Sequence, residues 1–399
     1  MNVDDAPESK SARLQMPRNG RPLIAHVVFS FDYGGLENGV ANVVNGLPEE
    51  TFAHTIIALT SASSFRARIR KADVGIHVLE KRPGKDPAAY MRLFSLLRRL
   101  QPTVVHTRNL STLECALFAR LAGVPARLHG EHGWDIFDPD GTSRKYRALR
   151  RIVNPVVDRF IAVSQDLQRW LTTTVGISAH KVQRICNGVD TGLFRPLGGI
   201  ARRELPAALL PSESIVVGSV TRFSAIKDPL NLVRAFIAAR QDAAGAALKL
   251  VMVGDGPLRA QAHTLLNESG AADAAWLPGS RDDVAALLRE FDVFALGSRR
   301  EGISNTVLEA MSSGLPVIAT ATGGNVELVE DGATGTLVPP GDSHALARAM
   351  LEYVRDGALR RAHGNAARAR AEKEYSLERM LADYHALYLS CCSERRKVA

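Results

Sequence analysis

The sequence predicts an α/β protein with two domains, each built around a parallel β-sheet. The first indication is the length, because 399 residues ordinarily divide into two domains of usual size. The second is an alternation of short apolar runs with helical patterns along the chain, which is typical of doubly wound parallel sheets. The third is a segment near the middle, residues 197–212, whose glycines and prolines predict a linker.

Composition and charge narrow the class of protein. Apolar residues make up 46% and charged residues 23% of the chain, the ordinary mix of a globular protein. The first 20 residues are polar, so we expect a disordered tail rather than a signal peptide. No run of about 18 apolar residues predicts a membrane span. The net charge of +8 suits nucleic acid, anionic lipid or a phosphorylated substrate. No zinc-finger or RNP-type pattern occurs, which disfavours nucleic acid.

The cysteines indicate neither a metal site nor a disulfide framework. Cys391 and Cys392 are adjacent, while Cys115 and Cys186 lie far from them and from each other. This spacing fits no zinc or redox motif, so we expect reduced packing residues of a cytosolic protein.

The first domain is predicted to cover residues 21–196. Its apolar runs predict strands at residues 23–29, 54–60, 75–79, 103–107, 126–129 and 158–164, and a strand with a following turn at 182–190. Helical patterns occupy residues 40–47, 86–100, 110–122 and the basic stretch 144–151. That basic stretch suits either contact with an anionic membrane or an ordinary solvated helix face.

Two loops of this domain follow strands and carry candidate site residues. Gly34 and Gly35 lie in a strand-to-helix turn, where glycine lets backbone N–H groups approach a phosphate, although most such pairs are plain turns. His132 stands at the carboxyl end of the fifth strand, next to Gly133, and is either an ordinary surface loop histidine or a site residue, of which its position favours the second. We expect His26, His54 and His77 to be satisfied or solvated side chains without a functional role, while His106 and His129 stay open.

The second domain is predicted to cover residues 213–375, followed by a C-terminal segment at 376–399. Predicted strands begin at residues 215, 249, 275, 291, 315 and 335, and helices cover 229–240, 282–289, 343–354, 359–374 and 377–389. The first strand leads to Arg222 and Lys227. Two cations five residues apart can clamp a diphosphate and neutralise the charge that develops on it during bond cleavage.

The most informative stretch runs from Ser298 to Ala319. It reads as strand, loop, helix and strand, with its loop at the carboxyl end of a strand, where open parallel sheets bind ligands. Ser304 or Asn305 can cap the helix, whose N-terminus suits a phosphate. Glu309 can accept hydrogen bonds from a ribose diol, and Glu301 from hydroxyls of the group attached to the phosphate.

These residues resemble the Glu-x7-Glu motif of retaining glycosyltransferases of family 4, which have the GT-B fold. The pattern comprises Glu301, Gly302, Leu308-Glu309-Ala310-Met311, Gly314 and Pro316-Val317-Ile318. The resemblance extends from about Pro22 to about Leu389. The wording Glu-Gly-Ile-Ser-Asn-Thr-Val-Leu-Glu is similar to that of transferases of bacterial exopolysaccharide assembly. The resemblance implies two Rossmann-like domains that face a cleft, with the C-terminal helix crossing back to the first domain.

The resemblance also implies the roles of the site residues. The implied catalytic residues are His132, Arg222, Lys227 and Glu301. The implied donor-binding residues are Gly34, Gly35, Arg222, Lys227, Gly254, Leu277, Glu301, Gly302, Ser304, Asn305, Thr306 and Glu309. The sequence departs from the family wording at Thr-Arg-Phe and Lys-Asp-Pro, where many relatives have Gly-Arg-Leu and Lys-Gly, which puts the shape of this loop in question.

The implied reaction moves a sugar from a nucleotide-diphosphate sugar to an acceptor hydroxyl with retention of configuration. We identify no Asp-x-Asp placed to hold a metal between the phosphates, so no metal or other cofactor is expected. The expected partners are the nucleotide sugar and a glycan or lipid-linked acceptor, with possible contact to an anionic membrane at the inner face of the cell membrane. The alternatives are a sugar-nucleotide epimerase of the same fold and a catalytically silent binding subunit. The base, the sugar and the acceptor stay open.

Overall fold

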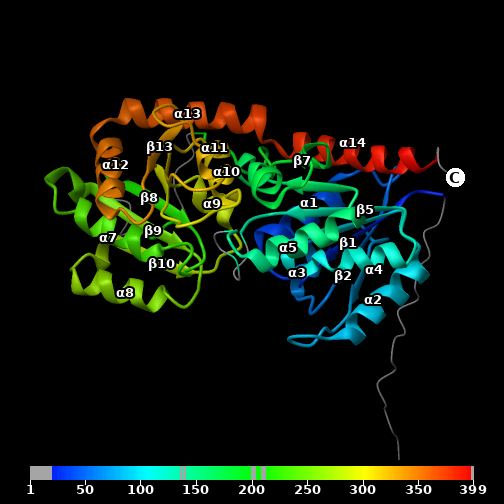
Figure 1. The fold of residues 1–399 in the computed structure, drawn as a ribbon. Helices are drawn as coiled ribbons and strands as arrows, with labels where there is room; N and C mark the ends of the chain where they lie inside the picture. The colour runs from blue at the N-terminus through cyan, green and yellow to red at the C-terminus, as the bar shows by residue number, and fades with distance from the viewer. Residues whose placement is uncertain (1–19, 135–137, 139–140, 199–203, 208–212, 397–399) are drawn as a thin grey trace, which may run out of the picture. The chain divides into compact units, whose positions relative to one another are not determined.

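Two parallel β-sheets form the framework of the computed structural model, which describes residues 20–134, 138, 141–198, 204–207 and 213–396 (Figure 1). The chain divides into two compact units, residues 1–128 with 388–399, and residues 129–387. The seven-stranded sheet has the order β3-β2-β1-β4-β5-β6-β7, and the six-stranded sheet the order β10-β9-β8-β11-β12-β13. Each sheet falls within one of the domains predicted from the sequence. The domain boundaries themselves stay a prediction.

The strands of the first sheet alternate with helices along the chain, as the sequence predicted. The strands are β1 (Leu23–Val28), β2 (Ala53–Ala58), β3 (Gly75–Val78), β4 (Val104–Arg108), β5 (Ala126–Glu131), β6 (Arg159–Ala162) and β7 (Val182–Arg184). The α-helices between them are α1 (Gly35–Gly46), α2 (Pro87–Leu100), α3 (Leu110–Leu113), α4 (Cys115–Leu121), α5 (Arg144–Val153) and α6 (Gln165–Arg169). The predicted helix 110–122 is thus two helices that meet at Glu114, whose backbone is itself helical.

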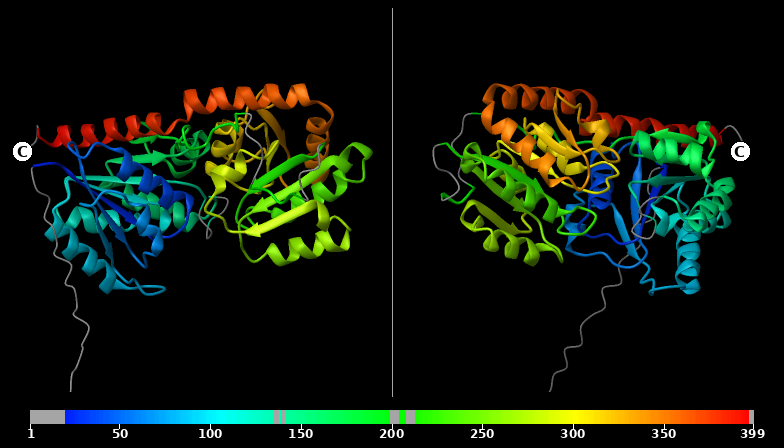
Figure 2. Two further views of the ribbon diagram at one scale, coloured as in Figure 1. Left: turned by 180° about the vertical axis from the view of Figure 1, so that it is seen from behind. Right: turned by 60° about the vertical axis from the view of Figure 1, so that its left-hand side comes forward.

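The second sheet repeats the plan within the second unit. Its strands are β8 (Ile215–Val220), β9 (Leu248–Val253), β10 (Ala275–Gly279), β11 (Val293–Leu296), β12 (Val317–Thr320) and β13 (Gly335–Val338). Its helices are α7 (Pro229–Ala239), α8 (Arg259–Glu268), α9 (Val284–Leu288), α10 (Asn305–Ser312), α11 (Asn325–Leu328), α12 (Ser343–Arg355) and α13 (Gly357–Glu374). The last helix is α14 (Leu377–Arg396), and the views in Figure 2 show helices along both faces of the second sheet.

Strand order explains where a ligand can bind. In both sheets the third, second, first and fourth strands are neighbours in that order, so the chain reverses its winding direction beside β1 and beside β8. A crevice opens at such a switch point, outside the carboxyl ends of the strands. In the second sheet, β8 pairs with β11, so the loops after these two strands meet there.

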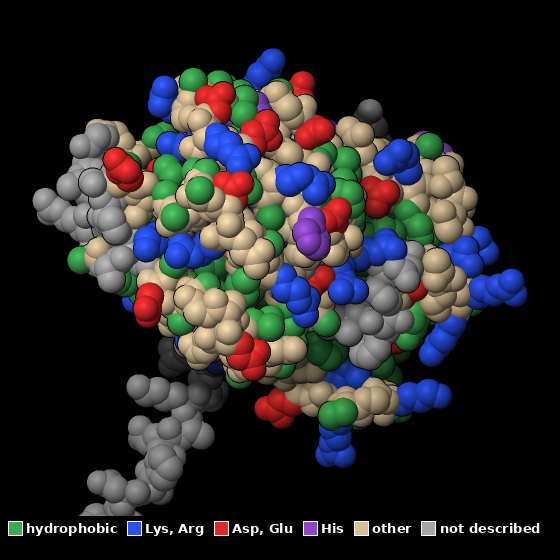
Figure 3. Space-filling view, turned by 90° about the vertical axis from the view of Figure 1, so that its left-hand side faces the viewer, with side chains coloured by type: hydrophobic (Ala, Val, Ile, Leu, Met, Phe, Trp, Pro, Cys, Tyr) green, Lys and Arg blue, Asp and Glu red, His purple; other side chains and the backbone are tan. Residues whose placement is uncertain are grey.

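Surface charge is mixed over the end of the second unit that carries α7, α8 and α12. Figure 3 shows this face, on which Lys and Arg side chains are interspersed with Asp and Glu. The excess of basic residues is therefore not gathered there. Among the described residues, no helix combines the length and apolarity needed to cross a membrane.

A buried cluster of polar rings fills part of the first unit and includes His26 and His54, two of the histidines for which the sequence predicted no functional role. His26 and His54 are buried and joined through Nε2 and Nδ1 at 3.0 Å. Arg108 donates from Nη2 to His26 Nδ1 at 3.0 Å, and His106 Nδ1 lies 2.9 Å from the Tyr388 hydroxyl. Because a guanidinium only donates, His26 accepts at Nδ1 and carries its proton on Nε2. It then donates to His54, so both rings are neutral.

This cluster is expected to weaken the fold in mild acid. Burial, with the charge of Arg108, holds the pKa of His26 well below its usual range, and burial lowers the pKa of His54 to about 3. The folded state therefore binds fewer protons than the unfolded state below the ordinary histidine pKa of about 6.5. Stability is complete above that pH and falls as the pH drops, by about 2.7 kcal/mol per pH unit for two such histidines. Urea unfolding between pH 5 and 7.5 measures the slope. His54→Asn should roughly halve it, whereas His180→Asn, at an exposed position, should not; equal slopes would contradict the assignment.

Candidate functional site

Two loops at the switch point of the second sheet bring the main predicted residues together. Arg222 and Lys227 lie on the loop after β8, and Glu301 lies on the loop after β11. Lys227 Nζ donates to both carboxylate oxygens of Glu301, at 2.6 and 2.7 Å. Ser298 Oγ donates to Glu301 Oε1 at 2.6 Å. Two of the four predicted catalytic residues therefore form one ion pair at the point where the strand order predicts a ligand.

The side chains of Glu301, Lys227 and Arg222 differ in how far each is exposed to solvent. The Glu301 side chain is 5% exposed and that of Lys227 is 21% exposed, while Arg222 is exposed. A carboxylate removed from water in this way depends on its charge partner, because a buried charge without one is costly. Lys227 is open enough to exchange Glu301 for another anion.

Asp228 stands where many relatives have a glycine, and its backbone conformation is one that favours glycine. Asp228 has φ 44° and ψ 52°, the left-handed conformation that favours glycine, and it precedes Pro229 at the start of α7. Arg299 Nε donates to Asp228 Oδ2 at 2.8 Å, and the Arg299 N–H donates to the carbonyl of Ile226. The ion pair with Arg299 stabilises a backbone conformation that is strained for a residue with a side chain.

Glycines pack the Glu301 loop tightly on two sides. A Cβ on Gly302 would lie 2.7 Å from both Gly133 Cα and the carbonyl oxygen of His132. A Cβ on Gly323 would lie 1.9 Å from the carbonyl oxygen of Glu301, and one on Gly324 would lie 2.1 Å from that of Gly302. The half-buried His132 is thus brought against the Glu301 loop, and two predicted catalytic residues from distant loops become neighbours.

Helix α10 begins immediately after this loop. Ser304 is the N-cap residue, as predicted, and its Oγ accepts from the N–H of Val307. Ser304 Oγ lies 3.2 Å from Thr306 Oγ1, and Asn305 Oδ1 accepts from Asn187 Nδ2 at 2.7 Å. Glu309 is half-buried, one turn into the helix. Asn187 lies in the turn that the sequence predicts within residues 182–190, and nothing in that prediction indicates its contact with the helix start.

The remaining predicted donor residues occupy three further places. Gly254 follows β9 with φ 132°, and a Cβ there would lie 2.0 Å from the carbonyl oxygen of Thr221. The Leu277 side chain is buried, and its carbonyl accepts from Arg259 Nη2 at 2.7 Å. Gly34 is the N-cap residue of α1, and Gly35 begins that helix after β1. Gly34 and Gly35 belong to the first unit and the other predicted site residues to the second.

Two acidic residues near His132 have structural roles. Glu131, which borders the predicted site, is buried and paired with Arg150 Nε at 2.6 Å, so it is poorly placed to meet an acceptor. The Arg150 guanidinium holds the pKa of the Glu131 carboxyl far below its usual range, despite the opposing effect of burial. An Asp-x-Asp pattern does occur at Asp138-Pro139-Asp140, and the Asp138 carboxylate accepts from the N–H of Ser143 at 3.0 Å. Asp135, also near His132 in the sequence, lies outside the described residues.

Trp134 is a site neighbour that the sequence analysis did not single out. The guanidinium carbon of Arg300 lies 5.6 Å from the centre of the Trp134 ring, a cation–π contact. The ring of Trp170 packs edge-on against Trp134, with centroids 5.3 Å apart. Its signal in the sequence is an aromatic residue two positions after His132, which is too common a pattern to stand out.

Comparison with known proteins decides the family. A model described as "Glycosyltransferase Family 4" matches residues 33–193, and one described as "Glycosyl transferases group 1" matches residues 214–356, so the two cover both predicted domains. The chain belongs to glycosyltransferase family 4. The resemblance drawn from the motifs is confirmed.

Two curated relatives show how far sequence similarity extends. "Putative glycosyltransferase EpsF" of Bacillus subtilis (strain 168) is 30% identical over 205 residues, which cover 51% of this chain and 53% of EpsF. An α-1,3-galactosyltransferase of Escherichia coli is 29% identical over 284 residues, covering 69% of this chain and 72% of that one; its name gives UDP-Gal as donor and GlcNAc-diphosphoundecaprenol as acceptor. The aligned stretch thus spans about half the length of EpsF.

A solved structure agrees on the fold across nearly all of both chains. HepE of Anabaena, crystallised with UDP and glucose, superposes with a TM-score of 0.77 at 21% identity, covering 92% of this chain and 99% of HepE. The GT-B fold predicted for this member of family 4 is confirmed.

Proposed function

We propose that this protein transfers a sugar from a nucleotide-diphosphate sugar to an acceptor hydroxyl, with retained anomeric configuration, in the synthesis of a bacterial surface glycan. The observation that carries the proposal is the Lys227–Glu301 ion pair at the switch point of the second sheet. A departing diphosphate needs a cation at this point to balance its charge, and the sugar hydroxyls need a carboxylate that accepts their hydrogen bonds. Membership of family 4 supports the same reaction class.

The geometry suggests how the donor replaces internal contacts. The donor diphosphate takes the place of the carboxylate next to the Lys227 ammonium and also recruits Arg222 and the N-terminus of α10. Glu301 then turns to the sugar hydroxyls and Glu309 to the ribose. Fixed cations of this kind act most strongly where charge develops in the transition state.

The chemical step needs no enzymic nucleophile in this proposal. The bond from the anomeric carbon to the phosphate oxygen breaks, and a bond from that carbon to the acceptor oxygen forms on the same face. The acceptor proton passes to the released phosphate oxygen, so a nucleoside diphosphate and a glycoside are the products. In this proposal His132, whose backbone packs against the Glu301 loop, hydrogen-bonds the sugar or the leaving phosphate.

A lipid-linked acceptor is supported by the surface of α5. Its exposed residues recur on one helical face, and they are Arg144, Lys145, Ala148, Arg151 and Ile152. A face of this composition suits an anionic membrane surface, where undecaprenyl-linked acceptors such as the one named for the E. coli relative are carried. We accordingly place the reaction at the inner face of the cell membrane.

A donor screen with product analysis tests the proposal. Binding of the true donor raises the melting temperature, by linkage with folding. UDP-sugars are the first to test, because HepE was crystallised with UDP and the E. coli relative is named for UDP-Gal. Nucleoside diphosphate release in the presence of an undecaprenyl-diphosphate sugar, unchanged by a chelator, is the expected result. Sugar interconversion without any acceptor would identify an epimerase instead, and binding without turnover a silent subunit.

A further inference from the structure

Glu327 belongs to none of the motifs identified in the sequence. Both of its carboxylate oxygens and its backbone carbonyl have partners in the structure. Its Oε2 accepts from the N–H of Gln165, the first residue of α6, at 2.7 Å, and its Oε1 is paired with Arg184 at the end of β7. Its backbone carbonyl accepts from the Tyr375 hydroxyl at 3.0 Å and from Arg370 Nη2 at 3.1 Å. A side chain on a short surface helix ordinarily has more freedom than this.

Helix α11, which carries Glu327, begins where the Glu301 loop is packed. Gly323 and Gly324 precede the helix, and they are the two glycines whose Cβ positions fall on the carbonyl oxygens of Glu301 and Gly302. Atoms packed this closely cannot move independently, so a shift of α11 displaces the backbone of Glu301.

The segment that contains Arg184 also contacts the other end of the loop. Asn187, three residues after Arg184, donates to Asn305 Oδ1 at the start of α10. Thus Arg184 and Asn187 contact the elements on either side of the Glu301 loop. One short segment therefore determines the position of both.

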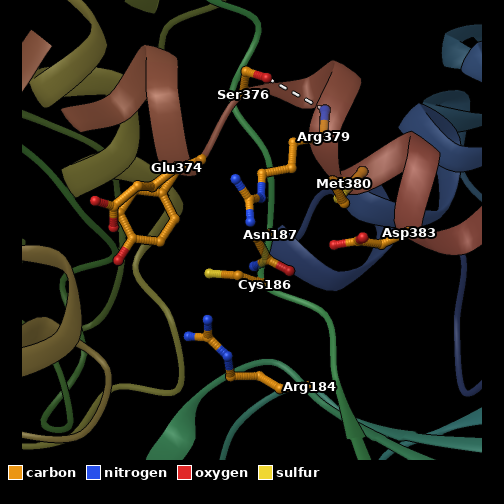
Figure 4. A pocket seen from close by; sticks show the side chains of 9 residues that line it. Arg184, Cys186, Asn187, Glu374, Ser376, Arg379, Met380 and Asp383 are labelled. Carbon is orange, nitrogen blue, oxygen red and sulfur yellow. Dashed lines mark hydrogen bonds between the residues drawn. The ribbon is translucent and has the colours of Figure 1, made fainter. Parts of the chain in front are cut away.

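A pocket beside Arg184 leaves room for the ion pair between Arg184 and Glu327 to open. Its volume is ≈ 280 Å³, and Figure 4 shows Arg184, Cys186 and Arg379 around it. The Arg184 side chain is 36% exposed, compared with 9% for Glu327. The guanidinium has room to swing into the pocket, whereas the carboxylate has not.

We propose that Glu327 is a positioning residue for the transfer reaction. Through its contacts with Arg184 and Gln165 it fixes α11, and α11 in turn fixes the position of Glu301 at which the donor binds. The inference rests on the proposed function for its effect on turnover, but its structural part does not. Charge-assisted hydrogen bonds to both carboxylate oxygens give the side chain a defined direction as well as binding energy. Loss of the pair loosens the loop before any donor binds.

Hydrogen exchange of the full-length protein, without ligand, tests the structural part. Glu327→Gln and Arg184→Ala are each expected to speed exchange within residues 298–305. The double variant should do no more than either single variant, because both remove the same interaction. Arg355→Ala is the matched control, since it breaks an exposed ion pair with Asp242 in the same unit. Exchange at 298–305 that is the same in the wild type and both single variants would overturn the proposal.

Kinetics test the functional part with the same variants. Glu327→Gln and Arg184→Ala should lower kcat/KM for the donor about 3- to 30-fold, with the melting temperature little changed. Arg184→Lys should restore part of the loss, because it restores the charge. Faster exchange with unchanged kcat/KM would refute the positioning role. A wild-type protein that neither binds nor turns over any nucleotide sugar would instead refute the proposed function, and the exchange result would still stand.

Discussion

Replacing Lys227 with alanine is expected to reduce sugar transfer about 100- to 1000-fold, the usual effect of removing one group that stabilises charge in a transition state. The ammonium contacts both carboxylate oxygens of Glu301. The variant therefore loses the cation that would bind the diphosphate. It also leaves the nearly buried Glu301 carboxylate with only Ser298 of these two hydrogen-bond donors. Initial rates of nucleoside diphosphate release, measured with saturating donor, give the loss directly.

Arg234→Ala is the control for Lys227→Ala. Arg234 is an exposed cation on α7, the helix that begins two residues after Lys227, so its removal changes the net charge equally without touching the ion pair. We expect near-normal turnover from the control. If Lys227→Ala also turned over at a near-normal rate, Lys227 would have no part in clamping the diphosphate.

The second large effect is expected from Gly302→Ala. The added Cβ would lie 2.7 Å from the backbone of both His132 and Gly133, and backbone atoms cannot rotate away as a side chain would. The His132 loop and the Glu301 loop must therefore separate. A displacement near 1 Å at a catalytic group can lower turnover about 100-fold, and overpacking costs about 1–3 kcal/mol of stability.

Gly39→Ala provides the comparison for this substitution. Gly39 lies within α1, and a Cβ there would meet nothing within 4 Å. Alanine should stabilise the helix by about 0.5–1 kcal/mol without changing turnover. Chemical denaturation and kinetics on both variants separate the clash from a general effect of replacing glycine. Full activity in Gly302→Ala would show that the two loops need not touch.

The fold was predictable because parallel strands buried on both faces leave a clear signal. All six residues of β1 and all six of β2 are buried, and such runs read as continuous apolar segments in the sequence. Helix ends were predicted less well. The break at Glu114 was not predicted, and α14 extends to Arg396 where the sequence predicted an end at Leu389.

The site was predictable where one motif supplied several residues, as between Glu301 and Glu309. Pairings between distant loops were not. Lys227 and Glu301 were both identified, but their mutual ion pair depends on β8 and β11 being neighbours. Glu327, Asn187 and Trp134 carry no distinctive signal of their own, since each acts through a contact more than 30 residues away along the chain.

Helix α14 has a consequence for the engineering of hybrid transferases. Met380 lies against Gly188, whose N–H donates to the methionine sulfur at 3.2 Å, while Tyr388, further along the same helix, is buried beside His106. Residues from 388 onward thus belong to the first unit although the whole of the second sheet lies between them and the first four strands in the sequence. A chimera joined within 197–212 that kept the preceding residues of this chain would need to import residues 388–396 as well, or His106 would face a foreign helix in place of Tyr388.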